Sequence, residues 1–321
     1  MKIAVLKESR GGETRVAATP ETVKKFVGGG HSVAIEKGAG DTASIPDSAY
    51  EAAGATVGTA AATLKGADAV FGVRAPSDAT IAKLPKGALL VALMEPHGNK
   101  ALAGTLAEAG VEALAMEFVP RITRAQAMDA LSSQSNLAGY RAVIEAAHIF
   151  GKAFPMMMTA AGTIAPAKVF VMGAGVAGLQ AIATARRLGA MVSATDVRPA
   201  AKEQVGSLGA KFIAVEDEEF KAAETAGGYA KEMSAEYRAK QAELVAAHIA
   251  KQDVVVTTAL IPGRPAPKLV TKAMVEAMKP GSVIIDLAAS MGGNCEIGTA
   301  DEITVHNGVS VAGFSNLPAR L

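Results

Sequence analysis

The segment Lys168–Asp196, KVFVMGAGVAGLQAIATARRLGAMVSATD, decides how this chain of 321 residues folds. Its apolar start predicts a buried strand, the stretch that follows to about Leu188 predicts a helix, and the apolar run at its end predicts a second strand. Gly173, Gly175 and Gly178 lie between the first strand and the helix in a G-x-G-x-x-G pattern. We interpret this segment as the β-α-β unit of a dinucleotide-binding fold.

Each glycine has a physical role in such a unit. Gly173 makes the tight turn, Gly175 lets the backbone approach a pyrophosphate, and Gly178 allows the helix to pack closely on the strand. The pyrophosphate is then expected at the helix N-terminus. Asp196 ends the second strand, 18 residues after Gly178. Its carboxylate should bind the adenosine ribose and repel a 2′-phosphate, which predicts NAD over NADP, although Arg198 could accommodate that phosphate.

Two further segments are candidate parts of the same site. Ligands of open α/β sheets bind at the carboxyl ends of strands, which nominates the backbone of Thr258, Ala259 and Leu260. Gly228 and Tyr229 lie in a long polar connection, which is either a lid over a bound nucleotide or an ordinary mobile loop.

Composition excludes several classes of function. Lys and Arg together number 32 and Asp and Glu 31, so no excess of charge favours nucleic acid or an anionic membrane surface. The single cysteine, Cys295, excludes an internal disulfide, and the N-terminus lacks a secretory apolar region, which together indicate a cytoplasmic protein. Proline, glycine and Lys168 interrupt the longest uncharged runs, so we expect no membrane span. One such run holds Met156, Met157 and Met158, which we expect to pack in the core.

The remaining chain predicts two Rossmann-like, doubly wound parallel-sheet domains separated by a cleft. The first covers residues 1–135 together with those after about 313, and the second covers residues 136–312. A linking helix at about 136–154 is expected to lead into the second domain. Strands are predicted at residues 2–6, 31–36, 68–73, 88–93 and 112–115, and then at six positions that end with 309–312.

A dense group of polar side chains precedes the linking helix and is hard to explain as scaffold. If residues 126–133 are helical, Gln126, Asp129 and Ser133 share one face. The group consists of Arg121, Arg124, Gln126, Asp129, Ser132 and Ser133.

No group suited to proton transfer or metal binding stands out in the sequence. The five histidines have no metal-like spacing and no obvious carboxylate partner. Hydride transfer directly between two nicotinamide rings moves no proton, so it needs alignment and exclusion of water rather than an acid or base. Dehydrogenases that act on alcohols or amines do need a proton-transfer group.

Four stretches resemble one family, the NAD(H)-binding component, or domain I, of proton-translocating NAD(P) transhydrogenase. They are MKIAVLKESRGGETRVAATPE, PRITRAQAMDALSSQSNLAGYRAV, FPMMMTAAGT and AETAGGYAKEM, and the resemblance extends along essentially the whole chain. It implies a homodimer that lies peripherally on the inner face of the cell membrane through partner subunits. NAD(H) bound in the cleft would exchange hydride with NADP(H) on a separate domain III, while a membrane domain couples this to proton translocation. The resemblance also implies a further helix after the last strand, whereas this sequence ends at Leu321.

The resemblance also implies roles for individual residues. Gln126 would align the nicotinamide, and Asp129 would pair with Arg121. The nicotinamide end would comprise Arg121, Gln126, Asp129 and Ser132, and the rest of the nucleotide would contact Val176, Ala177, Gly178, Asp196, Val197, Arg198, Gly228, Tyr229, Gln241 and Leu260.

Two other functions remain open from the sequence. Alanine dehydrogenases are related and share Arg15, but Arg74 stands where they carry a substrate lysine, and Leu93 falls near their catalytic histidine. His97 comes four residues too late. A nucleotide-sensing module without turnover also fits the missing acid and base.

Overall fold

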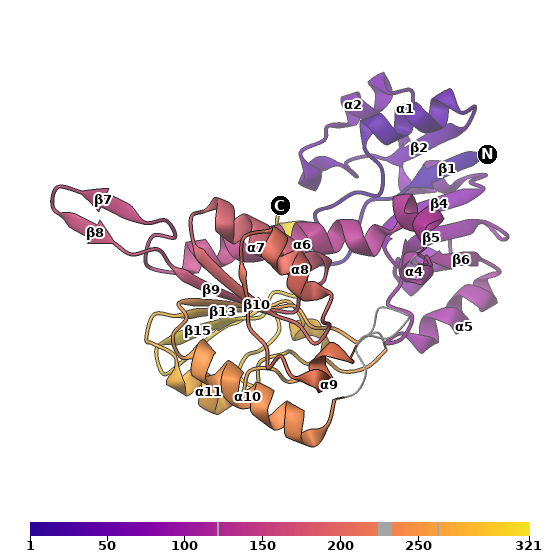
Figure 1. Ribbon diagram of the computed structural model, residues 1–321. Coiled ribbons are helices and arrows are strands. Elements are labelled where there is room, and N and C mark those ends of the chain that lie inside the picture. Colours follow the sequence, from indigo (N-terminus) through magenta and orange to yellow (C-terminus); the bar gives the residue numbers. More distant parts are fainter. Residues whose placement is uncertain (121, 224–232, 262) are drawn as a thin grey trace. The chain divides into compact units, whose positions relative to one another are not determined.

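The computed structural model describes residues 1–120, 122–223, 233–261 and 263–321. The chain separates into two compact units, Met1–Leu131 and Ser132–Leu321, each with its own sheet and core (Figure 1). The predicted fold class is confirmed, because both units hold a doubly wound sheet of parallel strands.

The first unit has one parallel sheet with strand order β3-β2-β1-β4-β5-β6 among its described residues. This order reverses beside β1 and β4, as in the doubly wound fold. Helix α1 begins at Pro20, where Thr19 accepts a hydrogen bond from the backbone of Thr22 and completes a capping box. The elements are β1 Lys2–Val5, α1 Pro20–Gly28, β2 Ser32–Glu36, α2 Asp47–Ala52, β3 Thr56–Gly58, α3 Ala60–Leu64, β4 Ala69–Arg74, α4 Asp78–Ile81, β5 Leu89–Leu93, α5 Lys100–Ala109 and β6 Glu112–Ala115.

The second unit repeats this order as β11-β10-β9-β12-β13-β15 and adds β14 at the edge. Strand β14 pairs antiparallel with β15, so among the described residues this sheet has seven strands rather than the six predicted. An antiparallel edge strand is common on otherwise parallel sheets. The elements are α6 Ala130–Ile149, β9 Lys168–Met172, α7 Val176–Arg187, β10 Met191–Thr195, α8 Ala201–Ser207, β11 Lys211–Phe212, α9 Glu218–Lys221, α10 Ala235–Ile249, β12 Val254–Thr257, α11 Lys272–Ala277, β13 Val283–Asp286, β14 Ile303–His306 and β15 Val309–Ala312.

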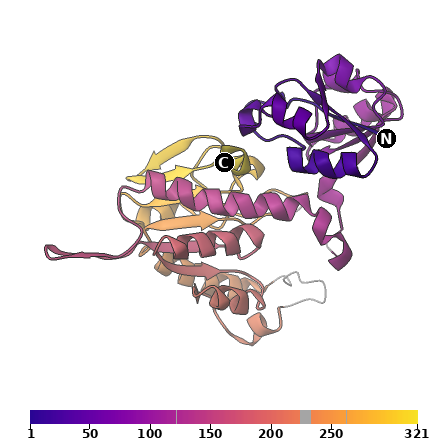
Figure 2. The same cartoon turned by 90° about the horizontal axis from the view of Figure 1, so that it is seen from above.

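Alternate side chains of the second sheet enter two cores, because successive residues of a strand point to opposite faces. Val169 and Val171 of β9 pack with residues of α6, α7 and α8, and Phe170 packs with α10 and α11. The helices accordingly lie on both faces of the sheet, with α6 running along one of them (Figure 2).

The residues after 313 lie in the second unit, although the sequence assigned them to the first. Phe314 and Leu317 are buried in the core beneath α6. Arg320 donates a hydrogen bond of 2.7 Å to Glu145 on α6, whose side chain is 5% exposed. The apolar contacts and this buried carboxylate hold the end of the chain against α6.

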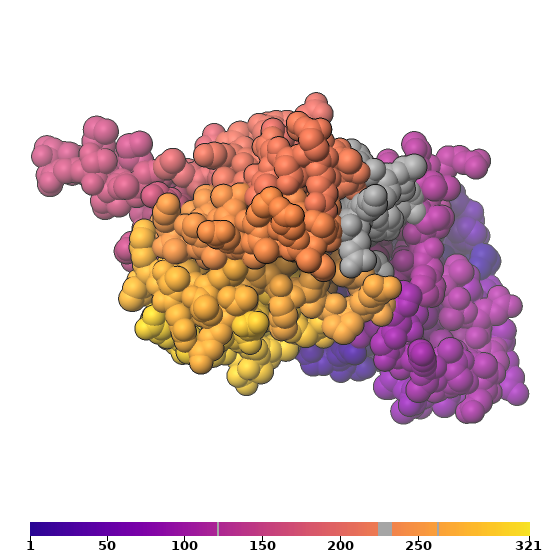
Figure 3. Space-filling view, turned by 60° about the horizontal axis from the view of Figure 1, so that its bottom comes forward, coloured from indigo at the N-terminus to yellow at the C-terminus, as the bar shows by residue number. Residues whose placement is uncertain are grey.

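The predicted core position of the three consecutive methionines is wrong. Met157–Thr159 forms β7, which pairs antiparallel with β8, Gly162–Ile164, and the two make an arm that projects from the second unit (Figures 1 and 3). Met158 is 74% exposed and Ile164 is 54% exposed. An uncharged run is the same signal for a core strand and for such an arm, and only its surroundings distinguish them.

Candidate functional site

The glycine loop between β9 and α7 has the geometry that its sequence predicts. Gly173 has a φ of +106°, and a Cβ atom there would lie 2.6 Å from the hydroxyl of Thr258. A Cβ atom at Gly178 would lie 1.8 Å from the carbonyl oxygen of Gly173, so only glycine permits this contact between helix and turn. A Cβ atom at Gly175 would have nothing within 4 Å, so the backbone there is open to a ligand. The residues present thus fit a pyrophosphate.

The N-terminus of α7 adds hydrogen-bond donors to this loop. Gly175 caps the helix without a side-chain hydrogen bond, and Val176 and Ala177 begin its first turn. The N–H groups of a first turn have no partner within their own helix and carry the positive end of its dipole. They can therefore bind the oxygens of a pyrophosphate.

Asp196 follows β10 and joins three parts of the site. Its Oδ2 accepts a hydrogen bond of 2.7 Å from the backbone N–H of Ala174, which ties the carboxylate to the glycine loop. Its Oδ1 accepts from both the backbone N–H and the Nε of Arg198, each at 2.9 Å. The carboxylate is only 7% exposed, so its charge is held by these donors at the end of β10.

Gln241, on α10, lies beside the same strand end, for a reason that local sequence reasoning could not supply. Its Nε2 donates to the hydroxyl of Thr195 at 3.2 Å, and its Oε1 accepts from the backbone N–H of Val215 at 2.8 Å. Thr195 directly precedes Asp196. Gln241 therefore links α10 to the ends of two neighbouring strands at the candidate adenosine side.

Exposed apolar side chains surround the polar groups at this edge of the sheet. Val176, Val197 and Leu260 follow β9, β10 and β12, which are neighbours in the sheet, and they are 40%, 60% and 54% exposed. Thr258 holds the loop after β12 against the glycine loop, because its hydroxyl donates to the carbonyl of Gly173 at 3.0 Å. Flat apolar rings such as adenine and nicotinamide suit such surfaces.

The segment that precedes α6 differs from the predicted helix. Thr123–Met128 forms a short 3-10 helix that ends at Asp129, whose ψ of 84° is not helical, and α6 begins at Ala130. Gln126, Asp129 and Ser133 therefore do not share one helix face. Arg124 and Gln126 are exposed on the first unit, and Ser132 begins the second. Three predicted site residues lie outside the described residues, namely Arg121, Gly228 and Tyr229.

Family models match both units. The N-terminal domain of alanine dehydrogenase/PNT matches residues 4–138, and the C-terminal domain of the same family matches residues 142–321. The chain belongs to the alanine dehydrogenase/PNT family.

Known members of the alanine dehydrogenase/PNT family show where the chain stands within it. It is 58% identical to an NAD(P) transhydrogenase subunit alpha chain of Rhodospirillum rubrum, over 100% of this chain and 85% of that protein. The crystal structure of transhydrogenase from Sinorhizobium meliloti superposes with a TM-score of 0.93 at 57% identity, over 100% of this chain and 87% of that one. Alanine dehydrogenase of Mycobacterium tuberculosis is 31% identical, over 91% of this chain and 74% of the enzyme. The predicted resemblance to the transhydrogenase component is confirmed, as is the kinship with alanine dehydrogenase.

A charged cluster in the first unit bears on the kinship with alanine dehydrogenase. Arg74 Nη1 lies 2.6 Å from Glu95, and its Nε lies 3.5 Å from Glu13. Arg15 contacts Glu13 at 2.6 Å. The position at which the resemblance places a substrate lysine thus holds an arginine paired with two carboxylates. No local pattern marked these glutamates, because the pairs join separate segments of the sheet.

Other polar groups do not form a second site. Among the described residues, no cluster of three or more histidine, cysteine, aspartate or glutamate side chains could hold a metal ion. Cys295 is buried, and burial raises the pKa of its thiol to about 11, which makes it a poor nucleophile. The described residues also include no helix that is both long and apolar enough to cross a membrane.

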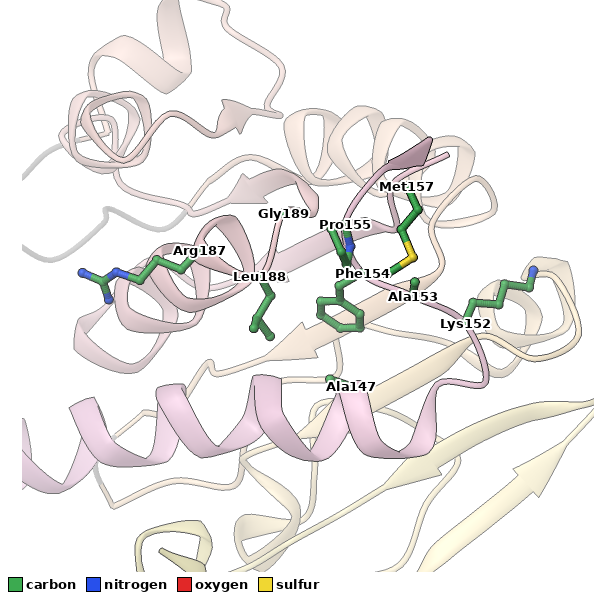
Figure 4. A pocket seen from close by; sticks show the side chains of 9 residues that line it. All are labelled: Ala147, Lys152, Ala153, Phe154, Pro155, Met157, Arg187, Leu188 and Gly189. Atoms are coloured by element: carbon green, nitrogen blue, oxygen red, sulfur yellow. The ribbon is translucent and has the colours of Figure 1, made fainter. Parts of the chain in front are cut away.

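A shallow pocket lies at the base of the arm, at the opposite end of α7 from the glycine loop. It has a volume of about 560 Å³, and Figure 4 shows Phe154, Leu188 and Met157 on its walls. Lys152 and Arg187 supply its charges. It is therefore separate from the candidate nucleotide site, and its apolar lining continues the exposed surface of the arm.

Proposed function

We propose that this chain is the NAD(H)-binding component of a proton-translocating transhydrogenase. The observation that carries the proposal is the dinucleotide site of the second unit, in a chain similar along its whole length to a transhydrogenase alpha subunit. The hydride leaves C4 of NADH bound here and joins C4 of NADP⁺ on a partner domain. NADH and NADP⁺ become NAD⁺ and NADPH, and no proton is exchanged. The chain's task is therefore to bind, align and exclude water.

The nucleotide would cross the carboxyl edge of the second sheet. The pyrophosphate would lie on the glycine loop and the first turn of α7, and the adenosine beside Asp196, Val197 and Arg198. The nicotinamide would then extend past β12 and Leu260. Residues of the segment 121–132 would meet it across a cleft between the two units, with Gln126 aligning the ring and Asp129 paired with Arg121.

Reconstitution with an NADP(H)-binding partner domain tests this function. NADH and thio-NADP⁺, whose reduced form absorbs at longer wavelength, are mixed with both proteins, and we expect hydride exchange only when both are present. Gln126→Ala should slow the exchange and leave NADH affinity within about twofold, because alignment rather than affinity is proposed. The matched control is Gln204→Ala, an exposed glutamine on α8. Rapid oxidation of alanine by the chain alone would instead identify an alanine dehydrogenase.

The choice of NAD over NADP rests on Asp196 and Arg198. A 2′-phosphate would meet a carboxylate that is nearly buried, and the guanidinium of Arg198 already contacts both oxygens of that carboxylate. Asp196→Ala should therefore narrow the ratio of NADH to NADPH affinity by about tenfold or more, as titrations of nucleotide fluorescence would measure. Asp196→Asn keeps an acceptor for the N–H of Ala174 and separates the effect of charge from that of loop anchoring. An unchanged ratio in both variants would contradict this assignment.

The arm supports a homodimer. An isolated hairpin of two short strands is marginal in water, and an exposed apolar surface marks an interaction site. Residues 153–167 carry no charge, and the pocket at the arm's base offers apolar walls beside it. A second copy related by a twofold axis would cover both arms at once. Met158→Lys should convert the dimer to a monomer in sedimentation experiments, whereas Met291→Lys, an exposed methionine away from the arm, should not. A dimer that persists in Met158→Lys would exclude the arm as the interface.

The position of the protein in the cell follows from the same proposal. The dimer would lie on the inner face of the membrane, held there by the membrane domain of partner subunits. Hydride exchange would be coupled to proton translocation through those partners.

A further inference from the structure

One buried side chain outside the predicted site connects a distant segment to the nucleotide edge. Asn294 is fully buried, in the loop that follows β13. Gly292 and Gly293, with φ values of +93° and +77°, turn the chain immediately before it. This turn aims the side chain of Asn294 at the loop after β12, which carries Leu260.

The amide of Asn294 makes three hydrogen bonds with that loop. Its Oδ1 accepts from the backbone N–H of Ala259 at 3.0 Å, and its Nδ2 donates to the carbonyl oxygens of Ala259 and Pro267, both at 2.8 Å. Both backbone groups of Ala259 are thus paired as a neighbouring strand would pair them. The third bond joins the far end of the loop to its beginning.

The segment that carries Asn294 is itself anchored to the sheet. Asp286, 4% exposed at the end of β13, accepts from the backbone N–H of Cys295 at 3.0 Å and from the hydroxyl of Thr257 at 3.1 Å. The carbonyl oxygen of Asn294 accepts from the backbone of Leu269 at 2.7 Å. The amide therefore reaches Ala259 from a fixed position.

The loop so held is continuous with the glycine loop. Thr258, the neighbour of Ala259, donates from its backbone N–H to Met172 at 2.9 Å and from its hydroxyl to Gly173 at 3.0 Å. A displacement of Ala259 would consequently move Leu260 and disturb the turn at Gly173. A side chain in this place needs one acceptor and two donors, which an amide supplies and a carboxylate or hydroxyl does not.

We infer that Asn294 is a positioning residue for the nicotinamide side of the nucleotide site, through Ala259 and Leu260. The inference rests on the proposed binding of NAD(H). Strand β12 lies on the side of β9 away from β10 and Asp196, so its loop faces the nicotinamide half rather than the adenosine half. Asn294 thereby affects NADH and leaves AMP, which holds only the adenosine half, unaffected.

The test compares Asn294→Asp with the wild-type chain in calorimetric titrations with NADH and with AMP. The carboxylate has the same size but faces two carbonyl oxygens, so we expect NADH affinity to fall at least tenfold and AMP affinity to stay within twofold. Gln252→Glu is the matched control, because Gln252 is 4% exposed, donates to the carbonyl of His248 and precedes β12 at the opposite end of the sheet. It should lower the melting temperature to a similar extent without changing NADH affinity.

A second variant keeps the test informative if the buried charge prevents folding. Asn294→Ser removes two of the three bonds without adding charge and should also weaken NADH selectively. Equal weakening of NADH and AMP, or no weakening of either in a folded variant, would overturn the positioning role. Failure of the wild-type chain to bind NADH would instead refute the proposed function itself.

Discussion

The contact between α6 and α7 provides a sharp test of how the fold shapes the phosphate site. A Cβ atom at Gly139 would lie 2.0 Å from the carbonyl oxygen of Ala177 and 2.8 Å from its carbonyl carbon. Both are backbone atoms, so no side chain can rotate away. A separation of 3.0 Å, which Cβ atoms rarely fall below, requires α6 and α7 to move apart by about 1 Å (3.0 minus 2.0).

Gly139→Ala should therefore cost more in overpacking than it gains in helix propensity. Overpacking of this kind costs about 1–3 kcal/mol, against a propensity gain of about 0.5–1 kcal/mol. We expect a melting temperature lower by a few degrees. The N–H groups of the first turn of α7 move with Ala177, so NADH affinity should fall about tenfold or more.

Calorimetric titration with NADH and a thermal melt measure both effects. Gly206→Ala is the control, because Gly206 lies within α8 and a Cβ atom there would meet nothing within 4 Å. It should stabilise the chain by about 0.5–1 kcal/mol and leave NADH affinity unchanged. A Gly139→Ala variant that melts and binds NADH like the wild type would refute the reasoning from backbone contact.

Three further outcomes are expected. Burial raises the pKa of Glu145, but hydrogen bonds from Arg320 and Arg141 outweigh it and lower that pKa below 4.5. The stabilisation is therefore present at neutral pH and lost as the pH falls below 4.5, so Glu145→Gln should cost about 1–2 kcal/mol at pH 7 in urea melts and almost nothing in strong acid; an equal cost at both would contradict this. Cys295, 3% exposed with a thiol pKa of about 11, should react with iodoacetamide at pH 8 about 100-fold more slowly when folded than in urea, as mass spectrometry would show, and equal rates would exclude its burial. Thr19→Ala removes the cap of α1 and should destabilise the first unit by about 1 kcal/mol in urea melts, whereas no change would mean that the cap contributes nothing.

The dinucleotide loop could be predicted because its physics is local. Each glycine acts on neighbours within a few residues, since Gly178 packs on Gly173 and Gly175 leaves the helix N-terminus open. Asp196 is placed by the length of one β-α-β unit. The alternation of apolar strands and amphipathic helices likewise predicts parallel sheets, because parallel strands need helical crossovers.

Side chains whose partners are distant in the chain could not be found in this way. Gln241 acquires its place through Thr195 and Val215, and Asn294 through Ala259 and Pro267. Neither residue belongs to a pattern in its own neighbourhood. Their contacts exist only once separate strands and helices have assembled.

The sequence by itself determined the two doubly wound units, the phosphate loop and the acid at the end of β10, because each depends on spacing within one supersecondary unit. Only the tertiary structure decided that the uncharged run at Met158 is an exposed arm, that the last residues pack on α6, and that Gln241 and Asn294 support the nucleotide edge. The physical reason is that burial and hydrogen bonding depend on what surrounds a side chain. Those surroundings are supplied by segments far away in the chain.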